Sequence, residues 1–264
     1  MSGQRTEPHA NASPDRPARP ATGATDAPTA LVTGATSGIG KEIARQLGEG
    51  GWQVLVGARE LARGQGVAAE VGGRALLIDV TDAASIARAA SEVAKLDVLV
   101  NNAGVSVDTA SVVTDVGVDV FRRTYETNVF GVVAVTNAFL PALRRSAHPR
   151  IVNISSGTGS LTWSTGVNPQ FDFQAAATGA GAAYRSSKAA LNALTVFYAH
   201  ALAADRIKVN ALAPGLRATN LNPVAATAGG DPAEAAAGAV RLALLPDDGP
   251  SGLLFSFDGT VAPW

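Results

Sequence analysis

The chain has 264 residues and a formal net charge of −1 at pH 7, which argues against a protein that lives on nucleic acid phosphates. It has no cysteine, so disulfides, thiolate metal sites and cysteine nucleophiles are excluded together. The histidines, His9, His148 and His200, lie far apart and show no ligand spacing. We therefore expect no structural metal.

Targeting and membrane segments are not evident. Residues 1–28 are rich in Pro, Ala, Thr and charges, and they cannot bury enough apolar surface to order themselves, so a disordered tail is expected there. They also lack the apolar region of a signal peptide. The most apolar later stretch, 129–143, is interrupted by Asn137 and Pro141 and is typical of a buried helix. We expect a cytoplasmic protein with neither a membrane nor a nucleic-acid partner.

From residue 29 onward, short β-branched runs alternate with helical patterns. Strands are expected over 30–34, 53–59, 74–80, 97–104 (with its exit loop), 150–156, 207–215 and 252–259. Helices are expected over 40–51, 60–70, 82–96, 116–145, 183–204 and 231–245. The strands are continuously apolar, which indicates that both of their faces are covered. The pattern predicts a single α/β domain, 29–264, with a doubly wound parallel sheet of about seven strands and helices on both faces.

The loop "TGATSGIG" (33–40) follows the first strand and opens a helix. In a doubly wound sheet, ligands bind outside the carboxyl ends of the strands, where this loop lies. Gly34, Gly38 and Gly40 let the backbone approach a pyrophosphate at the helix N-terminus, where free N–H groups and the dipole favour anions. A glycine-rich turn without a ligand is the alternative, and the position of the loop favours the phosphate site.

The glycine spacing is G-x-x-x-G-x-G, and four further motifs accompany it. They are "NNAG" (101–104), the asparagine of "ETNVFG" (126–131), "ISS" (154–156) and "YRSSK" (184–188). Together they resemble the short-chain dehydrogenase/reductase family over essentially everything from residue 29 onward. The resemblance implies a Rossmann-type fold and a nicotinamide cofactor. It points to carbonyl-reductase-like members with an insertion before the Tyr-x-x-x-Lys helix.

The resemblance also implies where the cofactor binds. After the second strand, Arg59 suits the 2′-phosphate of NADPH, whereas an acidic side chain would select NADH. Ser37 stands where family members often carry a second basic residue, so NADPH is favoured and NADH is the alternative. "PGLRAT" (214–219) resembles the segment that covers the nicotinamide carboxamide. The expected cofactor-binding residues are Gly34, Thr36, Ser37, Gly38, Ile39, Gly40, Arg59, Asp79, Val80, Asn101, Ala103, Gly104, Tyr184, Lys188, Pro214, Gly215 and Thr219.

Tyr184 and Lys188 lie one helical turn apart, so the phenol and the ammonium face the same way. By the resemblance, Tyr184 exchanges a proton with the substrate oxygen. A free phenol titrates near 10, and a neighbouring ammonium favours phenolate, so Lys188 is expected to lower the pKa of Tyr184 and to bind the nicotinamide ribose. Ser155 and Ser156 are adjacent and point in opposite directions along the strand, so only one can serve, and the resemblance implies that Ser156 polarises the substrate carbonyl. Asn128 is implied to hold a relay water through its backbone carbonyl.

Two segments depart from the family pattern and are expected to form the substrate pocket. The insertion 157–183 leaves the sheet beside the catalytic serine, and a tolerated surface insertion is the alternative. Its candidate pocket residues are Trp163, Phe171 and Phe173. Residues 216–230 are short where relatives often carry a two-helix lid, so an open pocket for a bulky substrate is expected. The C-terminal Trp264 either packs on the domain or touches the substrate.

The leading hypothesis is an NADPH-dependent carbonyl reductase that moves hydride to a ketone of a mid-sized apolar substrate, with Tyr184 as general acid. Alternatives are reduction of an imine, a non-redox cyclisation or isomerisation with the cofactor held structurally, and a sensor that binds NADP(H) without turnover. The complete set of Asn128, Ser156, Tyr184 and Lys188 argues against the sensor. The sequence gives neither the identity of the small-molecule substrate nor the physiological direction, and it leaves monomer and homodimer open.

Overall fold

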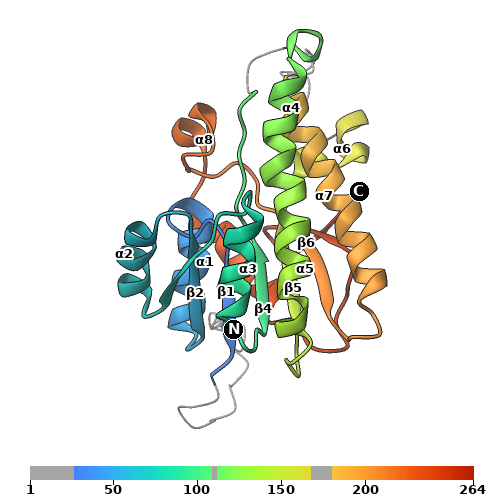
Figure 1. Cartoon of the computed structure of the whole chain (residues 1–264). Coiled ribbons are helices and arrows are strands. Elements are labelled where there is room, and N and C mark those ends of the chain that lie inside the picture. The colour runs from blue at the N-terminus through green and yellow to red at the C-terminus, as the bar shows by residue number, and fades with distance from the viewer. Residues whose placement is uncertain (1–26, 109–111, 168–179) are drawn as a thin grey trace, which may run out of the picture.

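The computed structural model describes residues 27–108, 112–167 and 180–264, and these residues are built around one sheet (Figure 1). The strands are β1 (Thr29–Val32), β2 (Gln53–Ala58), β3 (Arg74–Leu77), β4 (Val98–Asn101), β5 (Arg150–Ile154), β6 (Lys208–Ala213), β7 (Leu254–Ser256) and β8 (Val261–Ala262). They form an eight-stranded sheet in the order β3-β2-β1-β4-β5-β6-β7-β8. The strand order reverses between β1 and β4, and that switch point is where a doubly wound sheet binds its ligand.

Helices cover both faces of this sheet, as Figure 1 shows. The α-helices are α1 (Gly38–Glu49), α2 (Leu61–Val71), α3 (Ala83–Ser91), α4 (Val118–Tyr125), α5 (Gly131–Leu143), α6 (Leu161–Thr165), α7 (Ala182–Ala201), α8 (Pro223–Ala228) and α9 (Pro232–Ala243). Short 3₁₀ turns lie at Val113–Asp115 and Gly157–Gly159. Apolar residues of α1, α2 and α9 pack on one face, and those of α3, α5 and α7 pack on the other.

Successive side chains along each strand point alternately into these two cores. In β1, Ala30 and Val32 belong to the core under α1, whereas Leu31 belongs to the core under α5. All three are fully buried, which explains why the strand is apolar at every position. On the α5 side, Phe139 is the largest fully buried side chain. The predicted parallel, doubly wound sheet with helices on both faces is therefore confirmed.

The C-terminal end of the sheet differs from the prediction of about seven strands. The strand expected over 252–259 ends at Ser256, and a turn at Gly259, with φ 93°, sends the chain back as the short β8. β8 pairs antiparallel with β7. Only glycine adopts this left-handed conformation without strain, so the turn requires it. The two residues of β8 are too few to show an alternating pattern in the sequence.

The helix expected over 116–145 is also different. It is divided into α4 and α5 by a π-helical turn, Glu126–Phe130, in which the N–H of Gly131 reaches back to the carbonyl of Glu126. Such π-turns are frequent at functional sites because the extra residue redirects one turn of side chains. This one contains Asn128. Residues 216–230 were expected to be short and open, and the structure places the six-residue α8 there.

The N-terminal boundary is close to the expected one. Of the predicted tail 1–28, only Ala27 and Pro28 lie within the described residues. The carbonyl of Pro28 accepts a hydrogen bond from the N–H of Gln53 at 2.9 Å, so Pro28 already pairs with β2 just before β1 begins. No helix in the described part of the chain is both long enough and apolar enough to cross a membrane.

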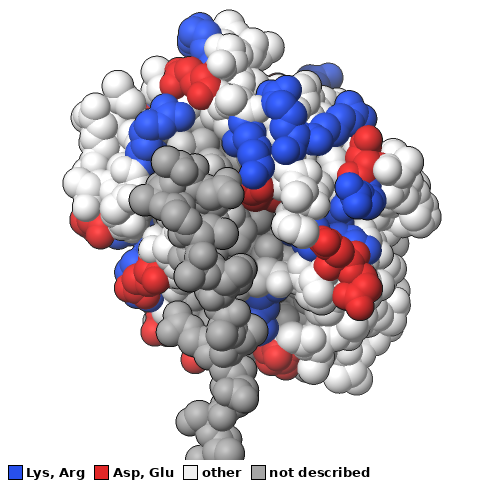
Figure 2. Space-filling view, turned by 90° about the horizontal axis from the view of Figure 1, so that it is seen from below, with Lys and Arg blue, Asp and Glu red and all other residues white. Residues whose placement is uncertain are grey.

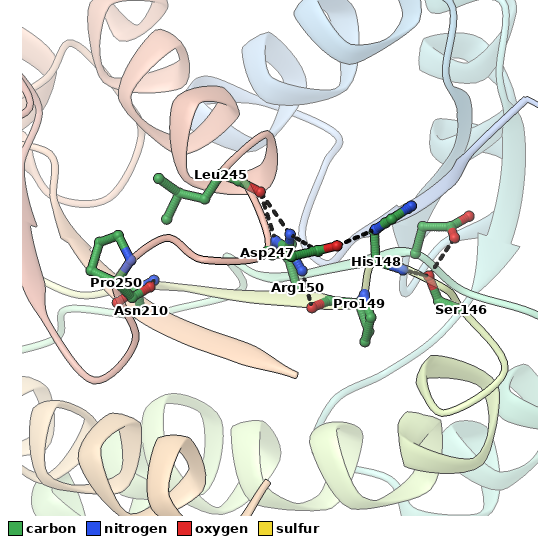
Figure 3. A network of polar contacts seen from close by, with 9 residues as sticks. Ser146, His148, Pro149, Arg150, Asn210, Leu245, Asp247 and Pro250 are labelled. Atoms are coloured by element: carbon green, nitrogen blue, oxygen red, sulfur yellow. Dashed lines mark hydrogen bonds and ion pairs between the residues drawn. The ribbon is translucent and has the colours of Figure 1, made fainter. Parts of the chain in front are cut away.

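At the amino end of β5, a buried arginine ties two connections together (Figure 3). Arg150 is only 3% exposed, and its guanidinium donates to the carbonyl oxygens of Pro149 and Leu245 and to Asp247 at 2.7 Å. His148 also contacts Asp247, at 2.8 Å. These bonds pin the loop after α9 beneath the sheet. The same edge, seen from below in Figure 2, carries basic and acidic side chains side by side.

Candidate active site

A cleft of about 470 Å³ lies at the carboxyl edge of the sheet, at the predicted switch point. It falls within the size range of ordinary small-molecule sites. Most of the predicted cofactor-binding residues line it together. They are Gly34, Thr36, Ser37, Gly38, Ile39, Gly40, Arg59, Asp79, Val80, Ala103, Gly104, Tyr184, Lys188, Pro214 and Thr219.

The glycine loop is shaped by close backbone approach. Gly34 and Gly38 have φ values of 62° and 54°, in the left-handed region that favours glycine. A Cβ on Gly40 would lie 2.3 Å from Nδ2 of Asn102 and 2.7 Å from the carbonyl oxygen of Gly34, so no larger residue fits. Asn102 braces the loop by donating hydrogen bonds to the carbonyl oxygens of Thr33 and Gly34. The three glycines are therefore required by geometry.

The start of α1 fits a pyrophosphate. Its N-cap residue, Ser37, makes no side-chain capping bond, and the first turn contains no acidic residue. The first N–H groups of a helix lack intrahelical partners and attract anions, and here they border the cleft. These residues therefore fit the phosphates of a dinucleotide.

One end of the cleft gathers charged groups after β2 and β3. Arg59 lines it as expected, and Arg63, one turn into α2, lines it as well. Arg63 was not predicted; its place in the first turn of the helix that follows Arg59 was the available signal. Glu60 lies 3.6 Å from Arg63. Asp79 accepts hydrogen bonds from the N–H and hydroxyl of Thr81, and these bonds hold its pKa below the usual range.

Two predicted cofactor residues do not line the cleft. Asn101 is buried beneath it, where its amide donates to Thr136 and to Asn153 at 2.9 Å. The cleft residue at this point is its neighbour Asn102, which the sequence analysis missed. Gly215, with φ 71°, lies behind the wall against Arg217. Asn101 and Gly215 therefore shape the wall without reaching the cleft.

The polar groups of the opposite end come from β5 and α7. Ser156 lies beside Tyr184. Its hydroxyl is hydrogen-bonded to the hydroxyl of Thr158 at 2.9 Å. The ammonium of Lys188 donates to the carbonyl of Ile154 at 2.8 Å and lies 5.6 Å from the centre of the Tyr184 ring. Ser155 points into the protein and donates to Asn192 at 2.5 Å. The expected opposite orientation of the two serines is observed, with Ser156 on the side of the tyrosine.

Asn128 lies in the π-turn behind these groups and is fully buried. Its amide donates to the carbonyl of Val105 at 2.9 Å and to the hydroxyl of Ser187 at 3.0 Å, and its oxygen accepts from the N–H of Val105. Ser187 in turn donates to the carbonyl of Tyr184. The side chain of Asn128 thus joins the segment after β4 to the tyrosine helix. The predicted role of its backbone carbonyl stays a prediction.

The acid–base properties differ from the expectation for Tyr184. Burial raises its pKa to about 12, and the nearby hydroxyl of Ser156 offsets this only in part. Burial lowers the pKa of Lys188 to about 8. Lys188 was expected to lower the pKa of the phenol, but among the protein's own groups desolvation is the larger effect. Tyr184 is therefore held in its protonated form.

A residue that the sequence did not indicate holds the start of the tyrosine helix. Asp108 is 4% exposed, and its carboxylate accepts hydrogen bonds from the N–H groups of Ala183 at 2.6 Å and Tyr184 at 3.2 Å. Its backbone carbonyl also accepts from Gly181. A carboxylate at this position satisfies free helix N–H groups and complements the helix dipole. Asp108 is far from α7 in the sequence, so no local pattern reveals it.

Of the expected pocket aromatics, only Trp163 lies within the described residues. Trp163 packs with Trp264 on a small core that includes Ala211 and Leu254, and it does not line the cleft. The N–H of Thr162 donates to the carbonyl of Trp264 at 3.0 Å, so the C-terminus packs on the domain and holds α6. Trp163 therefore packs at the sheet edge, and its predicted place in a substrate pocket stays a prediction. Phe171 and Phe173 lie outside the described residues.

The fold and these groups together define an α/β protein with a dinucleotide cleft. A family model described as short chain dehydrogenase matches residues 28–168 and 174–228. The chain is 33% identical to salutaridine reductase of Papaver bracteatum, over 86% of this chain and 93% of that protein. The chain belongs to the short-chain dehydrogenase/reductase family, whose members are oxidoreductases that use NAD(P)(H).

Two solved structures are similar to this chain in fold. NADPH-bound carbonyl reductase from chicken fatty liver has a TM-score of 0.73 at 26% identity, covering 90% of this chain and 99% of that chain. The 3-ketoacyl-(acyl-carrier-protein) reductase from Brucella melitensis, complexed with NADH, has a TM-score of 0.72 at 26% identity, covering 87% and 96%. Among the described residues, no group of three or more His, Asp or Glu side chains is placed to hold a metal ion.

Replacing Asp108 by alanine is expected to lower both stability and turnover. Loss of a helix-start acceptor costs about 0.5–2 kcal/mol of unfolding free energy. Turnover falls about tenfold, because the N–H of Tyr184 loses its acceptor and the phenol its fixed position. Asp231→Ala is the matched control, since it removes a similar acceptor from the start of α9, away from the cleft. Urea unfolding and kcat measure both effects; equal losses of kcat in the two variants would contradict the assignment.

Reduction is expected to slow at alkaline pH. Lys188, with a pKa of about 8, is charged below that pH and neutral above it, whereas Tyr184 stays protonated until about 12. The value of kcat/KM for a ketone should be level at neutral pH and fall about tenfold per pH unit well above 8. Initial rates at saturating cofactor measure this, with circular dichroism at each pH as the control for folding. A level profile up to pH of about 10 would show that the charge of Lys188 is not needed.

Proposed function

We propose that the protein is an NADPH-dependent reductase that transfers hydride to the ketone carbon of a mid-sized, apolar small molecule. The observation that carries the proposal is the buried phenol of Tyr184, which lies beside Ser156 and beside the buried ammonium of Lys188. The acid and the cation line one end of a cleft whose other end fits phosphates, and the Ser156 hydroxyl lies beside the acid.

Ser156 and Tyr184 act on the substrate oxygen in different ways. When bound, the cofactor supplies the hydride. Ser156 donates a hydrogen bond to the carbonyl oxygen and so polarises it. Tyr184, which burial keeps protonated, donates its proton to the same oxygen as negative charge develops there. The raised pKa of the phenol suits this reductive direction, because the acid must carry a proton at neutral pH.

Lys188 stabilises the phenolate that remains. Its ammonium lies beside the phenol ring and is fixed by the carbonyl of Ile154. In this low-dielectric setting, an ammonium next to the ring favours the deprotonated phenol more than it would in water. With a pKa of about 8, Lys188 also exchanges protons readily near neutral pH, so it can return a proton to Tyr184.

NADPH is the proposed cofactor because two arginines, Arg59 and Arg63, border the end of the cleft that follows β2. A 2′-phosphate there would accept charge-assisted hydrogen bonds from both guanidinium groups. The NADPH-bound carbonyl reductase noted above supports this preference. A similar neighbour binds NADH, so the preference must be measured on this chain.

The test of the reaction is NADPH oxidation, followed at the reduced nicotinamide absorbance, with a panel of bulky ketones that also contains a cyclic imine. Wild-type protein should oxidise NADPH with a ketone. Tyr184→Phe should lower kcat/KM about 100- to 10,000-fold, as loss of a general acid does, while NADPH binding is retained. Tyr198→Phe is the matched control, because Tyr198 lies on the same helix and bonds Asn137 away from the cleft.

Three results would redirect this proposal. Equal rates for wild type and Tyr184→Phe would remove the tyrosine from the mechanism. Turnover of the imine alone would make the protein an imine reductase. Conversion of a substrate without NADPH consumption would favour a non-redox cyclase or isomerase.

Separate variants test the cofactor preference. Arg59→Ala and Arg63→Ala should each raise KM for NADPH about 10- to 100-fold, the loss expected for a hydrogen bond to a charged group, and leave KM for NADH nearly unchanged. Arg74→Ala is a suitable control, because Arg74 pairs with Glu92 and does not line the cleft. If wild type prefers NADH, or if both cofactors are weakened equally, the two arginines do not select the 2′-phosphate.

A further inference from the structure

The loop after β6 contains an arginine that the reaction does not use. Arg217 lies between Pro214 and Thr219, which both line the cleft, but it does not line the cleft itself. It is only 6% exposed. An arginine is rarely buried so completely unless its charge and its donors are satisfied. We name residues 214–221 the cofactor clamp, since its members Pro214, Thr219, Asn220 and Leu221 form one wall of the cleft.

The guanidinium of Arg217 joins three parts of the chain. Its Nε donates to the carbonyl of Pro214 at 2.6 Å, within the clamp. Its terminal nitrogen is ion-paired with Glu234 in the first turn of α9. Its carbon lies 4.1 Å from the centre of the Phe257 ring, in the turn after β7. These contacts hold the clamp against two elements that belong to the fixed core.

The returning chain after α8 also rests on Arg217. The N–H of Ala218 donates to the carbonyl of Gly230, and the N–H of Gly230 donates to the carbonyl of Leu216. A Cβ on Gly229 would lie 2.1 Å from the carbonyl carbon of Arg217, so the two backbones are in direct contact. The excursion that contains α8 therefore begins and ends at this residue.

On its other side the clamp touches the glycine loop. A Cβ on Gly38 would lie 2.9 Å from Cγ2 of Thr219, so the threonine lies directly over the start of α1. α9, which carries Glu234, packs into the same core as α1. The ion pair of Arg217 with Glu234 thus links the clamp to the helix pair that carries the phosphate-binding loop.

We propose that Arg217 is a positioning residue for cofactor binding: its ion pair with Glu234 and its bond to Pro214 hold the clamp at the distance from the glycine loop that the nicotinamide end requires. This inference rests on the proposed cofactor site. A clamp that is ordered before binding costs less conformational entropy when the cofactor arrives. Loss of the pair therefore weakens cofactor binding more than it changes the chemical step.

The decisive variant is Glu234→Gln. The side chain of Glu234 is 60% exposed, so the change leaves the fold intact while the cation of Arg217 loses its partner. The dissociation constant for NADPH, from nicotinamide fluorescence, and KM for NADPH should both rise about tenfold, while kcat at saturating NADPH changes less than about threefold. Arg217→Lys keeps the charge and loses the planar fork, so it should give a smaller rise than Arg217→Met.

The chain contains a matched control in Arg150 and Asp247 (Figure 3). This pair also joins a buried arginine to a 60% exposed carboxylate, but at the amino edge of the sheet. Asp247→Asn should lower the melting temperature about as much as Glu234→Gln and leave the dissociation constant for NADPH within about twofold. An equal rise in both variants would mean that general loss of stability weakens the site, and the inference would be overturned.

The outcomes also separate this inference from the proposed function. If wild-type protein binds neither NADPH nor NADH, the proposed function is wrong and the positioning role is wrong with it. If wild type binds NADPH and Glu234→Gln binds it equally tightly, only the positioning role fails. If the Arg217→Met variant does not fold, the Glu234→Gln variant decides the question. The melting temperature of Glu234→Gln is measured alongside its NADPH binding.

Discussion

The buried ammonium of Lys188 is the interaction around which the active site is arranged. It is held at the carboxyl end of β5 by the carbonyl of Ile154, and the surroundings leave it almost no room. A Cβ on Gly104 would lie 3.6 Å from the ammonium, and one on Gly159 would lie 2.7 Å from the backbone of Lys188. A buried cation is costly, and its cost depresses its pKa. Gly159, after β5, is therefore a condition for packing the backbone of Lys188 this closely, whereas a Cβ on Gly104 would be in ordinary contact with the ammonium.

Much of the fold and half of the site could be predicted because both depend on local spacing. Apolar runs gave the strands, and glycine positions together with the spacing of Tyr184 and Lys188 located the cleft. Adjacent residues were harder to separate. Asn101 and Asn102 are chemically identical, and which one reaches the cleft depends on where β4 ends. Strand alternation showed that only one of Ser155 and Ser156 could serve, and the family resemblance selected Ser156.

Properties set by burial were not readable from the sequence. The direction of the pKa of Tyr184 depends on the desolvation of the phenol, and the distance to Lys188 along the helix does not determine it. Trp163 packs with Trp264 at the sheet edge, a contact that no spacing in the sequence indicates. Asp108 is joined to the start of α7 across a long stretch of chain, so no motif marks it. Long-range contacts of this kind are what single-sequence reasoning lacks.

Buried charges hold the loops at both edges of the sheet, and their different positions give them different consequences. Arg150 fixes the loop after α9 at the amino edge, where none of the described residues lines the cleft. Asp108 and Arg217 fix segments at the carboxyl edge, where the cleft is. The chemistry of the two arginines is the same, a buried guanidinium paired with an exposed carboxylate. In a parallel sheet, the active-site loops all follow the carboxyl ends of the strands. An arginine–carboxylate pair at the amino edge therefore serves stability alone, whereas one at the carboxyl edge also serves binding.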